Sequence, residues 1–317
     1  MEKKLTERKY TFGPVPSRRL GRSLGVDLVP YKTCTFDCIY CDLGRTTCKT
    51  TSRQSYVSPE EIGRELKLYL SVLDKKPDYI TISGSGEPTL NTNIRKIIHK
   101  IKEITFIPLA VLTNGSLLSM DEVRQDLQEA DIVLPSLDAV TPVLFEYINR
   151  PHSSLRIKEI ISGLNQFRKQ YRGQIWLEIL FCRGVNDGKE EIEKLKEVIE
   201  NIQPDKVQLN TPVRPPAEDF VFPLTLPQIE VIKKRFGNIA EVVYEFIGPM
   251  GDRFELGRDA EIIQLIKRRP CTAEDISKAL GLHVDEVVKY LGKLMREGRV
   301  HYRMHEHHCY YEGTLTH

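Results

Sequence analysis

Short apolar runs alternate with amphipathic stretches along most of the chain, which is the pattern of alternating strands and helices. Six runs have the length and composition of buried strands, at residues 24–29, 78–83, 107–113, 131–138, 174–181 and 205–211. Helical spacing of apolar residues occupies the intervals, at 59–73, 93–104, 120–130, 141–148, 155–170 and 190–202. This alternation predicts an α/β fold in which helices cover a parallel sheet, either open or closed into a barrel. Loops at the carboxyl ends of the strands should then carry the chemistry.

The pattern changes near residue 257. Three helical stretches at 257–269, 271–282 and 283–298 precede two short strands at 299–304 and 307–311. Three helices and a two-stranded wing are typical of a winged helix-turn-helix. We therefore expect two domains, residues 1–256 and 257–317, with the Pro- and Gly-rich segment 212–256 finishing the first and linking it to the second.

Composition and charge narrow the protein class. The 317 residues are 40% hydrophobic and 28% charged, an ordinary globular balance. We see neither a secretory signal nor an apolar run long enough to span a membrane, and we expect a cytoplasmic protein. The net charge of +2 hides an excess in residues 1–53, where eleven Lys or Arg face five Asp or Glu. Such an excess attracts an anionic ligand or forms a solvated basic arm.

Three of the seven cysteines, Cys34, Cys38 and Cys41, form a CxxxCxxC motif. An odd count in a long chain without a secretory signal argues against a disulfide framework and favours metal ligation. Three thiolates can ligate three irons of a 4Fe–4S cluster, which usually takes four, and leave one iron open to a small chelating molecule. A zinc site completed by Cys48 is the alternative from spacing alone.

The surroundings of this motif resemble those of the radical S-adenosylmethionine (AdoMet) superfamily. Tyr40 stands directly before the last cysteine, and Ser83-Gly84-Ser85-Gly86-Glu87-Pro88 follows the second strand, with Ser85 in place of a middle glycine. The resemblance implies a partial (β/α)6 TIM-type barrel, a 4Fe–4S cluster on the three cysteines and bound AdoMet. It also implies that Tyr40 lies near adenine, and that a turn containing Gly84, Gly86 and Glu87 binds the methionine amino group.

Polar residues near later strand ends extend the resemblance. Family members hold the ribose hydroxyls and the methionine carboxylate at such positions, which here are Asn114, Ser136, Asp138 and Glu178. The stretch 13–47 and the segments SGSGEPTL, VLTNGSLL, PSLDA, NRPH and QLNTPVRPPAED resemble the subgroup that includes the 4-demethylwyosine synthases. Those enzymes carry additional cysteines toward the N-terminus, and here no cysteine precedes Cys34, so the wyosine reaction is in doubt.

The resemblance implies an iron–sulfur oxidoreductase. Its cluster would cleave AdoMet to a 5′-deoxyadenosyl radical that abstracts hydrogen from a substrate, with ferredoxin or flavodoxin as electron donor. Arg18, Arg19 and Arg22 of the basic arm, and a loop with Arg45, Lys49 and Arg53, would face an anionic substrate. The alternative from another functional class is a DNA-binding redox sensor whose cluster only reports.

The expected winged helix suggests a macromolecular substrate, either tRNA or another RNA, or a peptide or protein. Lys289, Lys293 and Arg296 share one face of its third helix and could contact phosphates. Residues 257–317 nevertheless contain ten Lys or Arg against nine Asp or Glu, less basic than most nucleic-acid domains. Winged helices also bind peptides and act as docking modules, so these alternatives stay open.

Overall fold

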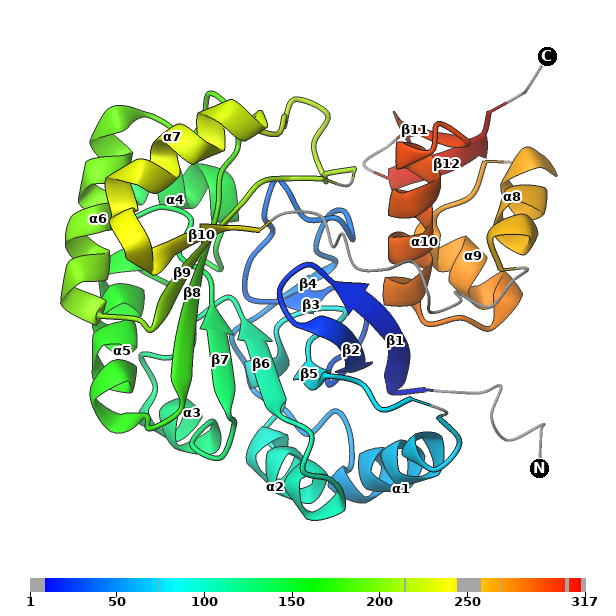
Figure 1. Cartoon of the computed structure of the whole chain (residues 1–317), viewed down its shortest axis with the longest axis horizontal. Coiled ribbons are helices and arrows are strands. Elements are labelled where there is room, and N and C mark those ends of the chain that lie inside the picture. The colour runs from blue at the N-terminus through cyan, green and yellow to red at the C-terminus, as the bar shows by residue number, and fades with distance from the viewer. Residues whose placement is uncertain are drawn as a thin grey trace.

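The computed structural model describes residues 9–73, 75–213, 215–243, 258–268, 270–305 and 308–314. Its centre is an eight-stranded sheet in which β1 pairs antiparallel with β2 and all other neighbours are parallel (Figure 1). In sheet order the strands are β1 (Thr11–Ser17), β2 (Gly21–Val26), β5 (Tyr79–Ile82), β6 (Leu109–Thr113), β7 (Ile132–Pro135), β8 (Gln174–Leu180), β9 (Lys206–Asn210) and β10 (Ala240–Val242).

Helices cover the outer face of this sheet (Figure 1). They are α1 (Pro59–Leu70), α2 (Ile94–Ile104), α3 (Asp121–Asp126), α4 (Pro142–Asn149), α5 (Ile157–Gln170), α6 (Lys189–Ile202) and α7 (Leu226–Phe236), with 3₁₀ turns η2 (Pro88–Leu90) and η3 (Gly237–Ile239). The expected α/β fold with a mostly parallel sheet is confirmed, and the curved sheet is consistent with a partial barrel.

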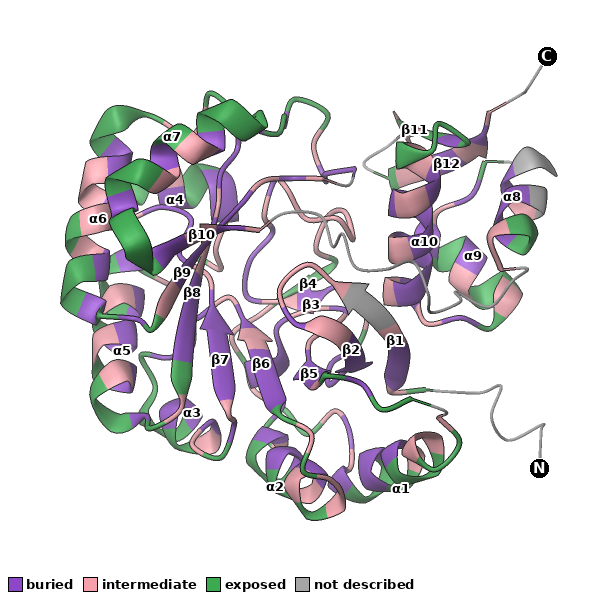
Figure 2. Cartoon of the chain, in the orientation of Figure 1, coloured by how far each residue is buried: buried purple, intermediate pink, exposed green. Residues whose placement is uncertain are grey.

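Sequence signals account for the helices locally. Ser58 accepts a hydrogen bond from the backbone N–H of Glu60 (3.2 Å), and Pro59 occupies the first helical position of α1. In α2, Ile94, Ile97, Ile98 and Ile101 recur at helical spacing and are fully buried. Figure 2 shows the buried stripes of the helices turned toward the sheet.

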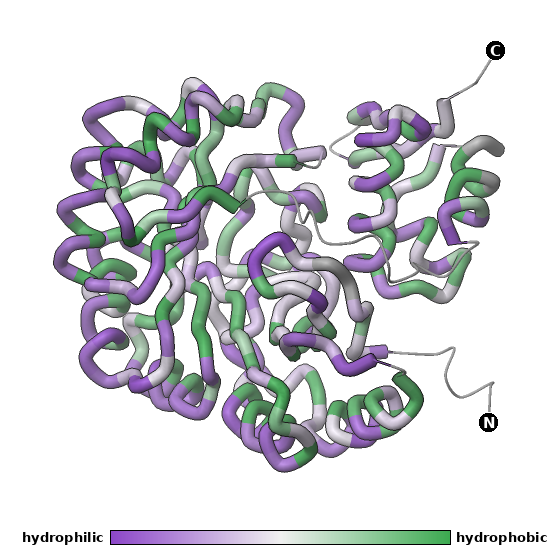
Figure 3. Tube along the Cα trace, in the orientation of Figure 1, coloured by the Kyte–Doolittle hydropathy of each residue, from purple (hydrophilic) through white to green (hydrophobic). Residues whose placement is uncertain are grey.

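The strands are buried on both faces, as expected for a parallel sheet under helices. Leu109 and Val111 of β6 lie in the large core below the helices, whereas Ala110 and Leu112 lie in a smaller inner cluster with Trp176. Alternate residues of one strand thus serve two cores. Figure 3 shows hydrophobic residues following the central strands. The inner cluster forms the floor beneath the candidate site, because Leu112 also lines the cavity described below.

All six predicted strands are present, but the sheet is larger than predicted, with seven parallel strands and the antiparallel β1. The strand β1 was not predicted because it contains Gly13, Pro14 and Pro16, and Gly and Pro are rare inside strands. The β1–β2 register shifts between Phe12 and Val15. β10 has three residues, and the paired β3 (Thr33–Cys34) and β4 (Cys48–Lys49) have two each, too short for a periodic pattern.

Residues 258–314 form a C-terminal unit with a hydrophobic core of its own. It contains α8 (Arg258–Arg268), α9 (Ala273–Leu280), α10 (Val284–Arg296) and the antiparallel pair β11 (Val300–His305) and β12 (His308–Gly313). Thr272 and Asp275 form a capping box at the start of α9, and Gly281 ends the helix at φ 64°. The expected domain boundary at 256/257 lies outside the described residues.

The C-terminal unit lies beside β1 and β2, next to the loop that contains β3 and β4 (Figure 1). Tyr31 and Leu43 of that loop pack against the unit's core, and the ring of Phe12 stacks on His283 at 4.6 Å. In the described part of the chain, each helix is too short or too polar to cross a membrane.

The packing of α5 predicts a large effect for a small substitution. A Cβ added to Gly163 would lie 2.5 Å from the backbone of Leu118 and Ser119, the end of the loop that follows β6. We expect Gly163→Ala to lower the free energy of unfolding by about 1–3 kcal/mol, because backbone cannot yield as a flexible side chain does. Urea denaturation measures this. Gly188→Ala, which meets nothing within 4 Å, is the control, and equal stability of the two variants would contradict the packing.

Candidate active site

The three motif cysteines lie on one loop at the carboxyl end of the sheet. Cys34 ends β3, and Cys38 and Cys41 follow in the loop toward β4. Two backbone hydrogen bonds attach this loop to the end of α4: Asp37 N–H to the Asn149 carbonyl (3.0 Å) and Ile39 N–H to the Ile148 carbonyl (2.9 Å). The loop therefore has a defined backbone position without any bound group.

The turn after β5 is attached to the other side of the cysteine loop. Lys32 N–H donates to the Ser85 carbonyl (2.7 Å), and Glu87 N–H donates to the Thr33 carbonyl (3.1 Å). The backbones approach so closely that a Cβ on Gly86 would lie 1.8 Å from the Thr33 carbonyl oxygen. Glycine is required there by contact, and the cysteine loop and the turn form one rigid assembly.

Asp27, the residue after β2, holds the same turn from below. Its carboxylate accepts hydrogen bonds from the Ser85 backbone N–H (3.1 Å) and the Ser85 hydroxyl. A Cβ on Gly84 would lie 2.5 Å from the Asp27 carboxyl carbon, and Gly84 has φ 143°. Gly84 is thus required both by conformation and by contact, and Ser85, the departure from a middle glycine, has its own partner.

Two asparagines donate to the cysteine sulfurs. Asn114 Nδ2 lies 3.5 Å from Cys34 Sγ, and Asn149 Nδ2 lies 3.5 Å from Cys38 Sγ. Burial raises the pKa of Cys34 to about 12, and burial also raises the pKa values of Cys38 and Cys41. Without a metal the three groups are thiols at neutral pH, and metal binding would release their protons.

The donor set fits a 4Fe–4S cluster better than a zinc ion. Three cysteines supply three of the four thiolates that a 4Fe–4S cluster usually takes. A structural zinc site needs a fourth protein ligand beside them. Cys48, the fourth ligand in the zinc alternative, is exposed on β4. Cys182 and Cys271 are buried in two different cores.

Lys32 supports the same conclusion. The residue is 5% exposed, and its Nζ has no hydrogen-bond partner among the residues that the structure describes. Burial lowers its pKa, against the influence of Cys41 and Asp37, so this ammonium faces the cysteine loop. Clusters ligated by thiolates carry negative charge, which a buried ammonium would balance.

Glu87 joins the turn to the end of β6. Its carboxylate accepts from the Thr89 N–H (3.0 Å), the Thr89 hydroxyl (2.6 Å), the Thr113 hydroxyl (2.6 Å) and the Asn114 N–H (2.7 Å). Asn114 Nδ2 in turn donates to the Thr35 hydroxyl at 2.7 Å. Burial raises the pKa of Glu87, while these hydrogen bonds lower it. Its carboxylate is therefore occupied by the chain itself.

Asp138 orients the aromatic residue of the motif. The Tyr40 hydroxyl donates to Asp138 at 2.5 Å, and Asn149 Nδ2 and the Leu180 N–H donate at 2.7 and 2.9 Å. Burial raises the pKa of Asp138 to about 6 despite these donors. Asn149 thereby contacts both Cys38 and Asp138, so the ring and the sulfur share a hydrogen-bonded support.

Glu178 lies in an ion pair on β8. Arg19 contacts it at 2.6 Å, and Asn210 Nδ2 donates to it at 2.8 Å. Burial raises the pKa of Glu178, but Arg19 and Asn210 outweigh burial and keep it below its usual value. Ser136 pairs with Glu178 through an isolated parallel bridge, which continues the β7–β8 register. The predicted strand-end residues are thus neighbours in space.

A cavity of about 300 Å³ opens beside the cysteine loop. Of the predicted site residues, Tyr40, Cys41, Gly84 and Glu178 line it. Arg18, Arg19 and Asn210 complete the barrel side, and Asp285, Val288 and Lys289 of α10 close the opposite side. Gln208, from the same strand as Asn210, instead donates to Glu241 of β10 at 2.8 Å.

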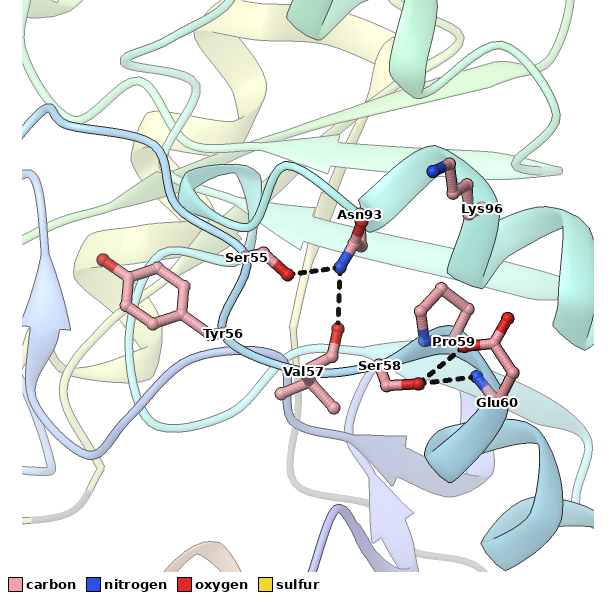
Figure 4. A pocket seen from close by; sticks show the side chains of 8 residues that line it. All are labelled: Ser55, Tyr56, Val57, Ser58, Pro59, Glu60, Asn93 and Lys96. Atoms are coloured by element: carbon pink, nitrogen blue, oxygen red, sulfur yellow. Dashed lines mark hydrogen bonds between the residues drawn. The ribbon is translucent and has the colours of Figure 1, made fainter.

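A second cavity, of about 310 Å³, lies between the starts of α1 and α2. Its polar side chains bond to one another: Asn93 donates to the Ser55 hydroxyl and the Val57 carbonyl, and the Ser58 hydroxyl contacts Glu60 (Figure 4). It contains none of the cysteines or strand-end residues, and we assign no chemistry to it.

Of the six expected anion-facing cations, Arg19, Arg45 and Arg53 form ion pairs, and Lys49 donates to the Arg150 carbonyl (3.1 Å). Arg18 donates to Asn210 (2.9 Å), and Arg45 pairs with Asp37 (2.9 Å). Glu218, from the segment QLNTPVRPPAED, clamps Arg45 and Arg150 together. Arg53 is away from the cavity.

Arg53 contacts Glu122 (2.7 Å), Asp126 (2.5 Å) and the Thr89 carbonyl (2.8 Å). Its side chain is therefore a structural clamp, and the expectation that it faces substrate is wrong. Asp27, Lys32, Asn149 and His283 are the contributors that sequence reasoning did not single out. A lone polar residue carries no spacing signal, although Asp27 and Lys32 flank the motif closely.

Comparison with known proteins agrees with this geometry. The family model described as Radical SAM superfamily matches residues 28–199. A UPF0026 protein of Methanocaldococcus jannaschii is 35% identical over 307 residues, covering 92% of this chain and 94% of that protein. A Brachyspira hyodysenteriae protein named GTPase Obg is 38% identical over 296 residues, and the match spans 92% of this chain but 43% of that protein.

Among solved structures, a radical SAM methyltransferase from Sphaerobacter thermophilus superposes with a TM-score of 0.55 at 16% identity, covering 69% of this chain and 65% of that one. That likeness shows the fold alone. The family model covers more than half of the chain, and the M. jannaschii relative extends along nearly all of it. The chain therefore belongs to the radical SAM superfamily and to the UPF0026 family.

Proposed function

We propose that this chain is an enzyme in which Cys34, Cys38 and Cys41 hold a 4Fe–4S cluster, and AdoMet bound there supplies a 5′-deoxyadenosyl radical that takes hydrogen from a substrate. One observation carries the proposal: two backbone hydrogen bonds and the contact of Gly86 with Thr33 fix the cysteine loop to the Ser83–Glu87 turn. An open iron and the groups that bind the methionine part of AdoMet must lie side by side, and the joined loop and turn support this arrangement.

Several residues around the cavity each contribute to the binding of AdoMet. Gly84 lines the cavity, and Gly86 lets the turn lie directly against the cysteine loop. Tyr40 presents its ring to the cavity while Asp138 holds its hydroxyl. Glu87 fixes Asn114 at the end of β6, and Ser136 and Glu178 follow at the ends of the next strands. These residues exclude water and orient the cofactor, which is the part that a protein plays in cofactor chemistry.

We also propose that the C-terminal unit is a winged helix, on the evidence of its three helices, the capped α9 and the antiparallel β11–β12 pair. The α10 face expected to meet phosphates is used internally: Lys293 pairs with Asp259 of α8 (2.6 Å), and Lys289 lines the cavity. This arrangement weighs against the DNA-binding sensor.

Loss of one cluster ligand tests the proposal. After anaerobic reconstitution and reduction, we expect the wild-type chain to convert AdoMet to 5′-deoxyadenosine, and Cys38→Ala to fall to background, because two thiolates cannot retain the cluster. Product is measured by chromatography and iron by colorimetry. Cys48→Ala, at an exposed cysteine, should keep both. Equal product from wild type and Cys38→Ala would refute the ligand assignment, and zinc in place of iron would support the alternative site.

The close contact at Gly86 gives a second test. Gly86→Ala would place a methyl group 1.8 Å from the Thr33 carbonyl oxygen, so the turn must move away from the cysteine loop. We expect AdoMet to bind at least about tenfold more weakly, the loss of roughly one hydrogen bond to a charged group. Equilibrium dialysis against labelled AdoMet measures the affinity, with Gly188→Ala as the matched control. Unchanged affinity in Gly86→Ala would show that this turn does not bind AdoMet.

A further inference from the structure

The N-terminus of α10 meets the barrel at a single buried histidine. His283 caps α10 through Nδ1, which accepts from the Asp285 N–H at 3.3 Å, while its Nε2 lies 3.2 Å from Asp27 Oδ2. Its ring stacks on Phe12 of β1 with an angle of 15°. The side chain is 10% exposed. A histidine held by two elements of the barrel is a fixed contact, unlike a surface ion pair.

Asp27 connects His283 to the Ser83–Glu87 turn. The same Asp27 oxygen that faces His283 also accepts both hydrogen bonds from Ser85. The Cβ position of Gly84 is occupied by the Asp27 carboxylate, so the turn and this side chain cannot move independently. A continuous chain of contacts therefore runs from α10 through His283 and Asp27 to the Ser83–Glu87 turn.

The helix itself forms a wall of the cavity. Asp285, Val288 and Lys289 line it together with Gly84 and Cys41, and Lys289 Nζ lies 5.3 Å from the centre of the Phe12 ring. Most of α10 is buried (Figure 2). The barrel alone would leave this side of the cavity open.

Two carboxylates flank the imidazole of His283. His283 lies between Asp27 and Asp285, whose nearest oxygens are 3.2 and 3.5 Å from its two nitrogens. Burial lowers the pKa of His283, but the hydrogen bond to Asp27 and the charge of Asp285 outweigh burial and raise it. Because Nδ1 accepts from the Asp285 N–H, the ring proton lies on Nε2, which can donate a charge-assisted hydrogen bond to the Asp27 carboxylate.

We propose that the C-terminal unit contributes to the AdoMet site. His283 is a positioning residue that fixes the Ser83–Glu87 turn through Asp27, and α10 closes the cavity over the cysteine loop. This inference rests on the proposed function, since it assigns a role toward the same turn. It accounts for the position of α10, whose N-terminal His283 contacts Asp27 and Phe12 of the barrel.

The test compares AdoMet affinity in full-length reconstituted variants. We expect His283→Ala to bind AdoMet about tenfold more weakly than wild type at equal iron content, since one charge-assisted hydrogen bond to Asp27 is lost. His283→Gln, whose amide reaches about as far as Nε2, should recover part of the affinity. Hydrogen exchange should rise in the peptide covering residues 83–90 of His283→Ala.

Thr272→Ala is the matched control, because it removes a helix cap in the same unit and the Thr272 hydroxyl accepts from the Asp275 N–H within α9, not from the Ser83–Glu87 turn. We expect it to bind AdoMet like wild type. Equal loss in Thr272→Ala, or wild-type affinity and exchange in His283→Ala, would overturn the inference. Failure of the wild-type chain itself to bind AdoMet would instead overturn the proposed function, so the two failures are distinguishable.

Discussion

The structure depends on one backbone junction, where the loop of three cysteines and the turn after β5 are joined by hydrogen bonds from Lys32 and Glu87. Such bonds are modest individually, about 1 kcal/mol net each. Their value lies in geometry, because Gly86 permits an approach that any side chain would prevent. The end of α4 bonds to the cysteine loop, and His283 of the C-terminal unit reaches the turn through Asp27.

Buried polar groups around the junction are linked by consecutive hydrogen bonds. Glu87 links the turn to Thr113 and Asn114, and Asn114 reaches the Cys34 sulfur. Asn149 links the Cys38 sulfur to Asp138, which holds Tyr40. A fully satisfied network in a low-dielectric interior rigidifies its members. Lys32 Nζ, which lacks a hydrogen-bond partner among the described residues, departs from this rule, and a negatively charged cluster at the cysteines would account for it.

The sequence predicted the elements with strong periodicity and the residues with strong spacing. Six strands and the cysteine motif with its glycine turn required only local information. The strand β1 was not predicted because its glycine and prolines oppose strand formation. The expectation that Arg53 faces a substrate failed because its acidic partners Glu122 and Asp126 are remote in sequence. His283 shows the same limit, since its meaning depends on Asp27, which only the tertiary fold places beside it.

Iron-57 Mössbauer spectroscopy of the anaerobically reconstituted chain, with and without AdoMet, tests the central claim most directly. The account predicts four irons and four sulfides per chain, with one iron changing its isomer shift when AdoMet is added, because three cysteines leave one iron open to the ligand. A cluster whose irons all ignore AdoMet, or a chain that takes up zinc and no cluster, would contradict it.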